Sequence, residues 1–204
     1  KYLTEMKKEV QDDIFMLYGS IGGLKKSIKN QEAALKTKNI STLTLDSVSM
    51  IISPINLDLN MSELTFNRMK NLGLTALSNN DSLNSQIINY YNSDLMFFKR
   101  GIAWLFEMHK KYLQYINYEQ EVIDYTSKNY EFPALYSQSK QALDSVNRIN
   151  MINYITSIKG RNLVLSDLDN KRYALGVLNR MQERSVKFLK SIYKELKIQN
   201  PKME

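Results

Sequence analysis

Residues 3–35 read LTEMKKEVQDDIFMLYGSIGGLKKSIKNQEAAL, and two sets of apolar residues recur every seven positions along this stretch. The sets are Leu3, Val10, Leu17 and Leu24 and, on the alternating position, Ile14, Ile21, Ile28 and Leu35. Such a repeat is typical of a helix that packs in a bundle. Charged residues take the opposite face, so we expect an amphipathic helix over about residues 2–37.

A glycine cluster, Gly19, Gly22 and Gly23, interrupts this helix. Each glycine inside a helix costs about 1 kcal/mol relative to alanine. The cluster therefore predicts a kink or a close approach by another backbone.

Two short helices are expected next. The first covers about residues 45–52 and ends before Pro54, because the residue preceding a proline is pushed out of the helical region. The second begins near Ser62, a candidate N-cap, and runs to Leu72. Gly73 is placed to take the left-handed conformation that ends it.

The longest predicted helix covers about residues 82–127, with Asn80 or Asp81 as its cap. Its apolar stripes are Ile88, Leu95, Ile102, Ile116 and Ile123 on one position, and Tyr91, Phe98, Leu105 and Tyr112 on the other. Unbroken, it would be roughly 65 to 70 Å long, which predicts an elongated molecule. Gly101, preceded by Lys99 and Arg100, marks the predicted bend if the helix is not straight.

The remaining helices are placed by proline, glycine and capping residues. Pro133 closes a loop, and Asp144 is a candidate cap for a helix that extends towards Gly160, a predicted hinge or stop. Its apolar residues are Val146, Ile149, Ile152 and Tyr154. The final helix, about residues 166–198, is predicted to begin at Ser166 and to end before Pro201. Its apolar stripe is Leu168, Leu175, Leu178, Leu189, Ile192 and Leu196.

These patterns predict an all-α protein. The 204 residues contain seven glycines and three prolines, too few turn formers for a many-stranded β-protein. We expect a single domain, residues 1–204, with the fold of an elongated antiparallel helical bundle of two or three long helices and short connecting helices.

Few residues offer catalytic or metal-binding chemistry. The chain has no cysteine and one histidine, His109, which shares the heptad position of Ile102 and Ile116. We interpret His109 as a buried seam residue; a buried pH switch or a general base is the alternative. Paired Glu-x-x-His motifs and phosphate-binding glycine loops are absent, so we expect no metal, no cofactor and no enzymatic activity. Asp12 and Asp13 are interpreted as a solvated face.

Positive charge is concentrated near the C-terminus. Residues 159–204 contain eleven basic and five acidic residues, which accounts for six of the seven net positive charges. The basic residues form a helical stripe of Arg180, Arg184, Lys187, Lys190, Lys194 and Lys197. A charged outer face near a helix C-terminus is the ordinary interpretation. The alternative is a surface for anionic lipid, nucleic acid or an acidic partner.

Three stretches carry a resemblance to a known family. They are residues 2–7 (YLTEMK), residues 66–73 (FNRMKNLG), and residues 80–83 (NDSL) leading to Tyr90 and Tyr91. The chain resembles an uncharacterised family of small single-pass membrane proteins of Bacteroidota. The resemblance implies a transmembrane anchor upstream of Lys1, a helical soluble domain facing the periplasm, and inner-membrane localisation. The family has no assigned activity, so it implies no catalytic residues.

Taken together, these features predict a non-enzymatic, extracytoplasmic module for binding, sensing or scaffolding. Its expected partners are an unknown protein or a second copy, bound through the helix seams, and the membrane through the upstream anchor. No nucleic acid is expected. Two alternatives stay open: a cytosolic nucleic-acid-binding module that uses the basic C-terminal helix, and an enzyme of unrecognised type.

Overall fold

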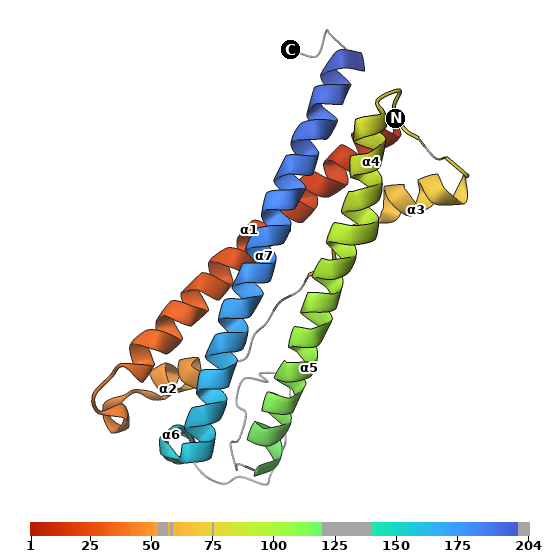
Figure 1. Ribbon diagram of the computed structural model, residues 1–204. Helices are drawn as coiled ribbons and strands as arrows, with labels where there is room; N and C mark the ends of the chain where they lie inside the picture. Colours follow the sequence, from red (N-terminus) through yellow and green to blue (C-terminus); the bar gives the residue numbers. More distant parts are fainter. Residues whose placement is uncertain (53–56, 58, 75, 120–139, 200–204) are drawn as a thin grey trace. The chain divides into compact units, whose positions relative to one another are not determined.

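The computed structural model describes residues 1–52, 57, 59–74, 76–119 and 140–199, without the side chains of residues 109, 111–119 and 140–144. The described residues form helices and contain no strand (Figure 1). The bounds are α1 Tyr2–Leu35, η1 Ile40–Thr42, α2 Leu45–Ile52, α3 Leu64–Asn71, α4 Asp81–Asn89, η2 Tyr90–Asp94, α5 Leu95–Glu119, α6 Lys140–Thr156 and α7 Ile158–Gln199. The all-α helical bundle is confirmed.

The chain divides into two compact units. Unit 1 comprises Lys1–Leu24, Asn56–Trp104 and Tyr173–Glu204, and unit 2 comprises Lys25–Ile55 and Leu105–Arg172. Helices α1, α5 and α7 each run from one unit into the other. The single domain, the elongated shape and the antiparallel order stay predictions.

Helix α1 is continuous through the glycine cluster. No described atom lies within 4 Å of the point where a Cβ would stand at Gly19, Gly22 or Gly23. The expected close approach by another backbone is therefore wrong. Leu17 and Leu24, which flank the cluster, are both buried. Their burial offsets the weak helix propensity of the glycines.

An aromatic cluster forms part of the core of unit 1. Phe66 of α3 stacks on Tyr91 with a centroid distance of 4.5 Å, and Tyr90 stacks on Phe188 of α7 at 4.3 Å. The hydroxyl groups of Tyr90 and Ser185 share a hydrogen bond of 3.0 Å. Burial raises the pKa of both tyrosines above the ordinary value, so both stay neutral. The cluster fixes η2 against α3 and α7.

The π-helical turn η2 changes the phase of the buried stripe. A π turn adds one residue to a helical turn, so the face that points to the core moves by one position. The buried positions are Leu83 and Ile87 before the turn, Tyr90 and Tyr91 within it, and Leu95, Phe98, Ile102 and Leu105 after it. Ile88, predicted in the seam, is 45% exposed because Ile87 takes its place.

The irregularity of the long helix does not lie at Gly101, where a bend was predicted if the helix is not straight. α5 is a regular α-helix through this residue, and the irregular turn lies at η2 instead. A Cβ at Gly101 would stand 3.5 Å from a methyl group of Val177 on α7, an ordinary van der Waals distance. Helices α5 and α7 therefore face each other at this glycine.

Helix α3 is capped by a side chain from another helix. Its N-cap residue, Glu63, makes no side-chain cap, and Ser62 lies one residue outside. A carboxylate oxygen of Glu9 on α1 accepts hydrogen bonds from the Thr65 amide at 3.1 Å and the Thr65 hydroxyl at 2.6 Å. Ser62, the predicted N-cap, lies one residue before the observed cap position, but its hydroxyl accepts a hydrogen bond of 3.4 Å from the Leu64 amide. Glu9, 56 residues away in the sequence, thus supplies a second acceptor for the first turn of α3.

The end of α3 agrees with the sequence. Gly73 has a φ of 68°, its amide donates to the Lys70 carbonyl at 3.0 Å, and the Leu74 amide donates to the Met69 carbonyl at 3.1 Å. This pair of hydrogen bonds is the Schellman motif. The predicted left-handed glycine is confirmed.

Unit 2 has its own apolar core. Its buried members are Ala34, Val48, Ile51, Ile52, Tyr154, Ile155 and Val164, which come from α1, α2, α6 and α7. Helix α2 has the predicted bounds and packs against α6. Arg148 of α6 donates to the carbonyls of Leu43, at 2.6 Å, and Ser41. These bonds hold the connector between α1 and α2 against α6.

A tight turn joins α6 to α7. Only Ser157 separates the two helices. Its hydroxyl donates to the Tyr154 carbonyl at 2.8 Å and accepts from the Gly160 amide at 3.0 Å. A Cβ at Gly160 would stand 2.0 Å from the Tyr154 carbonyl oxygen. Gly160 is thus required where the helices meet, although the stop comes earlier, at Thr156.

Several predicted positions in α6 and α7 are wrong. Asp144 lies inside α6, and Ser166 lies inside α7, so neither caps a helix. Val146 and Ile149 are exposed, because α6 turns the face of Asn147 and Tyr154 inward instead. The predictions for Pro133, Pro201 and residues 120–127 lie outside the described residues.

Candidate functional sites

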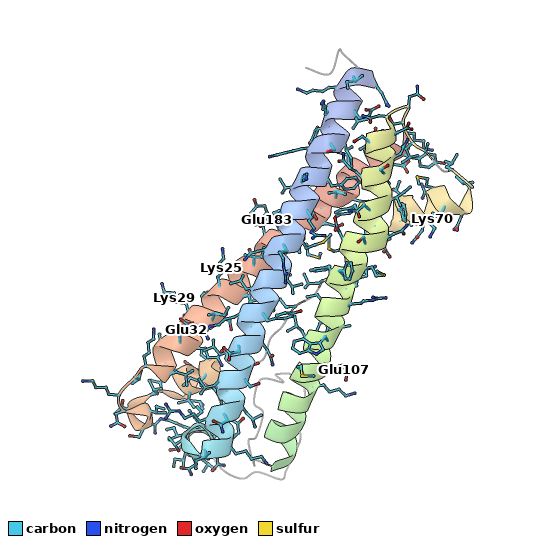
Figure 2. The ribbon with its side chains drawn as sticks, in the orientation of Figure 1. Lys25, Lys29, Glu32, Lys70, Glu107 and Glu183 are labelled. Carbon is cyan, nitrogen blue, oxygen red and sulfur yellow. The ribbon has the colours of Figure 1, made fainter. Side chains whose placement is uncertain are left out.

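The predicted basic stripe lies along α7, and all its members are exposed: Arg180, Arg184, Lys187, Lys190, Lys194 and Lys197. Within the described part of the chain, the four lysines make no ion pair, whereas Arg184 pairs with Asp94 of η2. One exposed acidic residue, Glu183, lies among them on α7 (Figure 2). The stripe therefore carries a net positive charge that its own helix leaves largely uncompensated.

A second acidic residue on this helix points elsewhere. Glu195 is buried, and its carboxylate accepts hydrogen bonds from the Ser78 hydroxyl and from Asn80 Nδ2 at 3.1 Å. These bonds lower the pKa of Glu195. Glu195 is thus engaged with the loop before α4, where Asn80 also caps the helix by accepting from the Leu83 amide.

A groove lies beside the stripe, on the outer side of the Gly101–Val177 contact. We call it the aromatic–arginine groove; it has a volume of about 300 Å³ and is lined by Asp94, Phe97, Phe98, Gly101, Tyr173, Val177, Arg180, Met181 and Arg184. Trp104 lies one turn beyond Gly101 and meets Tyr173 edge to face at 5.3 Å. The groove thus combines aromatic and guanidinium groups.

The aromatic residues of this region are unusually open to solvent. Phe97 is 61% exposed, and Trp104 and Tyr173 are each 46% exposed. Phe97, Gly101 and Trp104 follow at helical spacing, so the two large rings flank the glycine on one face of α5. A contiguous exposed apolar patch with a polar rim marks interaction surfaces in soluble proteins.

A second hollow continues from the groove along α4 and α7. It has a volume of about 620 Å³, and its wall on α4 is polar, with Ser82, Ser85 and Gln86. Asp94 and Arg184 line both hollows. Their ion pair therefore lies where the two hollows meet. Lys187 adds a further cation to the wall of the second hollow.

Unit 2 contains a buried polar cluster that was not among the predicted sites. Lys171 of α7 has no exposed surface, and its ammonium group lies 2.9 Å from Asp167 Oδ2 and 2.9 Å from Gln31 Oε1. The amide nitrogen of Gln31 donates to the Ile51 carbonyl at 2.8 Å. The cluster joins α1, α2 and α7.

Asp13 is a further residue that the sequence misplaced. It was interpreted as solvated, but it is only 5% exposed, whereas Asp12 is open to solvent. Burial raises the pKa of Asp13 from 3.8 to about 6, and the charges of Glu9 and Asp12 add to this rise. Its Oδ1 accepts from the Ser62 amide at 3.1 Å, and its Oδ2 has no partner among the described atoms.

The side chain of His109 lies outside the described residues, so its predicted place in a seam stays a prediction. Helix α5 does include His109. Among the described residues, no three His, Asp or Glu side chains are grouped as a metal site would require. Likewise, none of the helices in the described ranges combines the length and apolarity needed to cross a bilayer.

Comparison with known proteins gives no relative from which a function could be transferred. No protein-family model, curated protein or solved structure matches this chain.

Proposed function

We propose that this chain is a non-enzymatic binding module that docks an acidic segment of a partner protein, with an aromatic or aliphatic anchor, in the aromatic–arginine groove. The observation that carries the proposal is the exposure of Phe97, Trp104 and Tyr173 next to Arg180. These three large aromatic rings are exposed to water on two packed helices. A partner that covers them would gain binding free energy from the burial of their apolar surface.

The residue types at the groove support a protein partner. Tryptophan, tyrosine and arginine are the residues most enriched among those that dominate binding energy at interfaces. The groove lining supplies tyrosine and arginine, in Tyr173 and Arg180. Trp104 adjoins the groove through its edge-to-face contact with Tyr173. Because α5 and α7 are regular helices here, little ordering is required on binding.

The charge of the surroundings selects an acidic segment. Arg180 makes a hydrogen bond of 3.3 Å to the Gly176 carbonyl on its own helix, which leaves its charge uncompensated. Lys187 lies further along the same face and makes no described ion pair. Opposite charge on the partner would raise the association rate and align the segment along α7.

Two other polyanions are less well matched. Single-stranded nucleic acid binds by stacking bases on open aromatic faces, but Trp104 and Tyr173 are already engaged edge to face with each other. An anionic membrane surface would be attracted to the positive charge of the stripe, but it would not fill the groove. Both remain outcomes of the experiment below.

The cellular setting is part of the proposal and is supported by the resemblance to Bacteroidota single-pass proteins alone. On this basis we propose that the module is tethered to the inner membrane and faces the periplasm. The full-length gene product tests the tether: about 20 apolar residues upstream of Lys1 are expected. A polar upstream sequence would contradict it.

A selection experiment tests the partner chemistry. A random peptide library is displayed and selected against the intact chain, and the enriched peptides are expected to combine Asp or Glu with an aromatic or aliphatic anchor. The double variant Arg180→Glu, Lys187→Glu should lose these peptides, whereas Lys25→Glu, Lys29→Glu, which reverses two exposed charges on α1, should keep them (Figure 2).

Three results would overturn the proposal. The first is enrichment without acidic residues, and the second is binding that both double variants retain equally. The third is binding of single-stranded DNA or of phosphatidylglycerol vesicles that Trp104→Ala leaves unchanged, since the stripe alone would then explain the affinity.

A further inference from the structure

Unit 2 contains a cavity that is independent of the groove in unit 1. Its volume is about 570 Å³, within the range of small-molecule sites in proteins. The lining comes from the end of α1, the following connector, the end of α6 and the N-terminal part of α7 up to Arg172. The cavity residues divide into an apolar floor and a basic rim.

The floor is the outer layer of the unit 2 core. Leu35, Ile40 and Ile155 line the cavity and also belong to that core or pack against it. Leu168 is buried, but Leu165 is 43% exposed, one turn earlier on α7. Because Leu165 faces the cavity with much of its surface in water, an apolar group placed there would be stabilised.

The rim is strongly basic. Lys36, Lys38 and Arg161 line the cavity, are exposed, and make no ion pair among the described residues. The fourth cation, Arg172, is already paired with Glu32 at 2.8 Å and with Asp169 at 2.9 Å. Glu32 is the acidic residue of the lining, and Figure 2 shows it on α1.

Cations near helix C-termini are common, because the helix dipole favours them. Lys36 and Lys38 follow α1, so both have this ordinary explanation. Arg161 does not, because it lies at the N-terminal end of α7, where the dipole disfavours a cation. The dipole does not explain why they surround a hollow with a leucine floor. Both threonines of the lining, Thr37 and Thr156, donate their hydroxyls to carbonyls of their own chain segment. The free polar groups of the rim are therefore cationic.

The walls are held in place by contacts behind the cavity. The buried cluster of Gln31, Asp167 and Lys171 joins α1 to α7, and each member directly precedes a lining residue in the sequence. The Arg172–Glu32 ion pair crosses between the same two helices. A cavity with walls fixed in this way loses little entropy when a ligand enters.

We infer that the unit 2 cavity binds a small amphiphilic anion, with its carboxylate or phosphate headgroup at Arg161, Lys36 and Lys38 and its short apolar tail on Leu165 and Leu168. The guanidinium group of Arg161 suits either headgroup, because both accept paired hydrogen bonds. The inference goes beyond the proposed function, since none of these residues lines the groove of unit 1.

Titration of the intact chain with decanoate, followed by calorimetry and amide chemical shifts, tests the inference. Saturable binding is expected, with the largest shifts at residues 36–38, 156 and 161–168. Decyl phosphate should bind at the same residues. Decanol lacks the charge and acetate lacks the tail, so both should bind at least about tenfold more weakly.

Variants separate the cavity from general attraction to a basic protein. Arg161→Gln and Leu165→Gln should each weaken decanoate binding about tenfold, while Lys29→Gln, on the exposed face of α1, should leave it unchanged. Amide spectra of each variant verify folding. Equal affinity for decanol, equal affinity of Arg161→Gln, or binding only to anionic vesicles and not to free decanoate would overturn the inference.

Discussion

Asp13 places a carboxyl group where water cannot fully solvate it. Its pKa is raised from 3.8 to about 6, so the folded chain holds this proton more tightly than the unfolded chain does. Stability from this group is therefore present below pH 4 and is lost as the pH rises through 6. Glu9 and Asp12 on α1 increase the effect, and Lys99 on α5 reduces it.

Asp13→Asn is expected to stabilise the protein at neutral pH. The amide oxygen still accepts from the Ser62 amide, while the buried charge is removed. The free energy of unfolding should rise by about 1 to 2 kcal/mol at pH 7 and should be unchanged below pH 4. Urea denaturation across this pH range measures the difference. Asp12→Asn, at the exposed neighbour, is the control; a similar gain there would contradict the account.

Removing the charge of buried Lys171 is expected to destabilise the protein, in contrast to Asp13→Asn. Lys171→Met leaves the Asp167 carboxylate buried beside an apolar side chain and should cost about 3 to 5 kcal/mol. Adding Asp167→Leu removes the second charge and should recover most of that loss. Urea denaturation of the single and double variants measures both. A single variant as stable as the wild type would show that the pair is not desolvated.

Sequence periodicity contained a sign of this cluster. Gln31 occupies the heptad position that follows Leu24, and Lys171 lies seven residues before Leu178. A polar residue on an apolar stripe indicates a buried polar group. The sequence indicates the burial of Asp13 less clearly, because its neighbour Asp12 is also acidic. The partners themselves could not be predicted, since Gln31 and Lys171 are 140 residues apart.

At the scale of elements, the turn between α6 and α7 depends on one glycine. A Cβ at Gly160 would overlap the Tyr154 carbonyl oxygen. Gly160→Ala should therefore lower the free energy of unfolding by about 2 kcal/mol or more. Gly176 is the control on the same helix: nothing described lies within 4 Å of its Cβ position. Gly176→Ala should stabilise by about 0.5 to 1 kcal/mol, measured by thermal unfolding.

The π turn makes a prediction about deletions. Asn92 is exposed, and removing it would convert η2 to α-helix. The buried stripes of α4 and α5 would then still face the same side of the helix. Removing Arg100, exposed in regular α-helix, would rotate one stripe by about 100° relative to the other. Deletion of Asn92 should thus lower the melting temperature far less than deletion of Arg100 does. Equal losses would show that the turn does not set the phase.

Sequence patterns identified the helices better than their ends. The predicted ends of α2 and α3 agree with the structure. At α3 the reason is local, because Gly73 takes the left-handed conformation that ends the helix. Asp144 and Ser166 were misread, since either residue type is also tolerated inside a helix. The π turn could not be predicted from the sequence. Tyr90 and Tyr91 are both apolar enough to belong to a buried stripe, and only packing in the folded chain buries both.

At the scale of the whole molecule, composition predicted the class of fold and the location of charge. The few glycines and prolines agree with the helical structure, and the basic stripe of the C-terminal helix is exposed. The division into two units was not predicted, because three helices cross the boundary without a change in pattern. The groove was also not predicted, because Trp104 and Tyr173 are 69 residues apart in the sequence and come into contact only in the folded chain.

Trp104 allows the central claim to be tested directly, because it is the sole tryptophan of the chain. Its emission should shift to the blue and saturate when an acidic, aromatic-anchored peptide from the selection is titrated in. The affinity should fall as salt is raised and should be lost in Arg180→Glu, Lys187→Glu. Peptide binding that leaves the Trp104 emission unchanged would place the partner elsewhere and contradict the account.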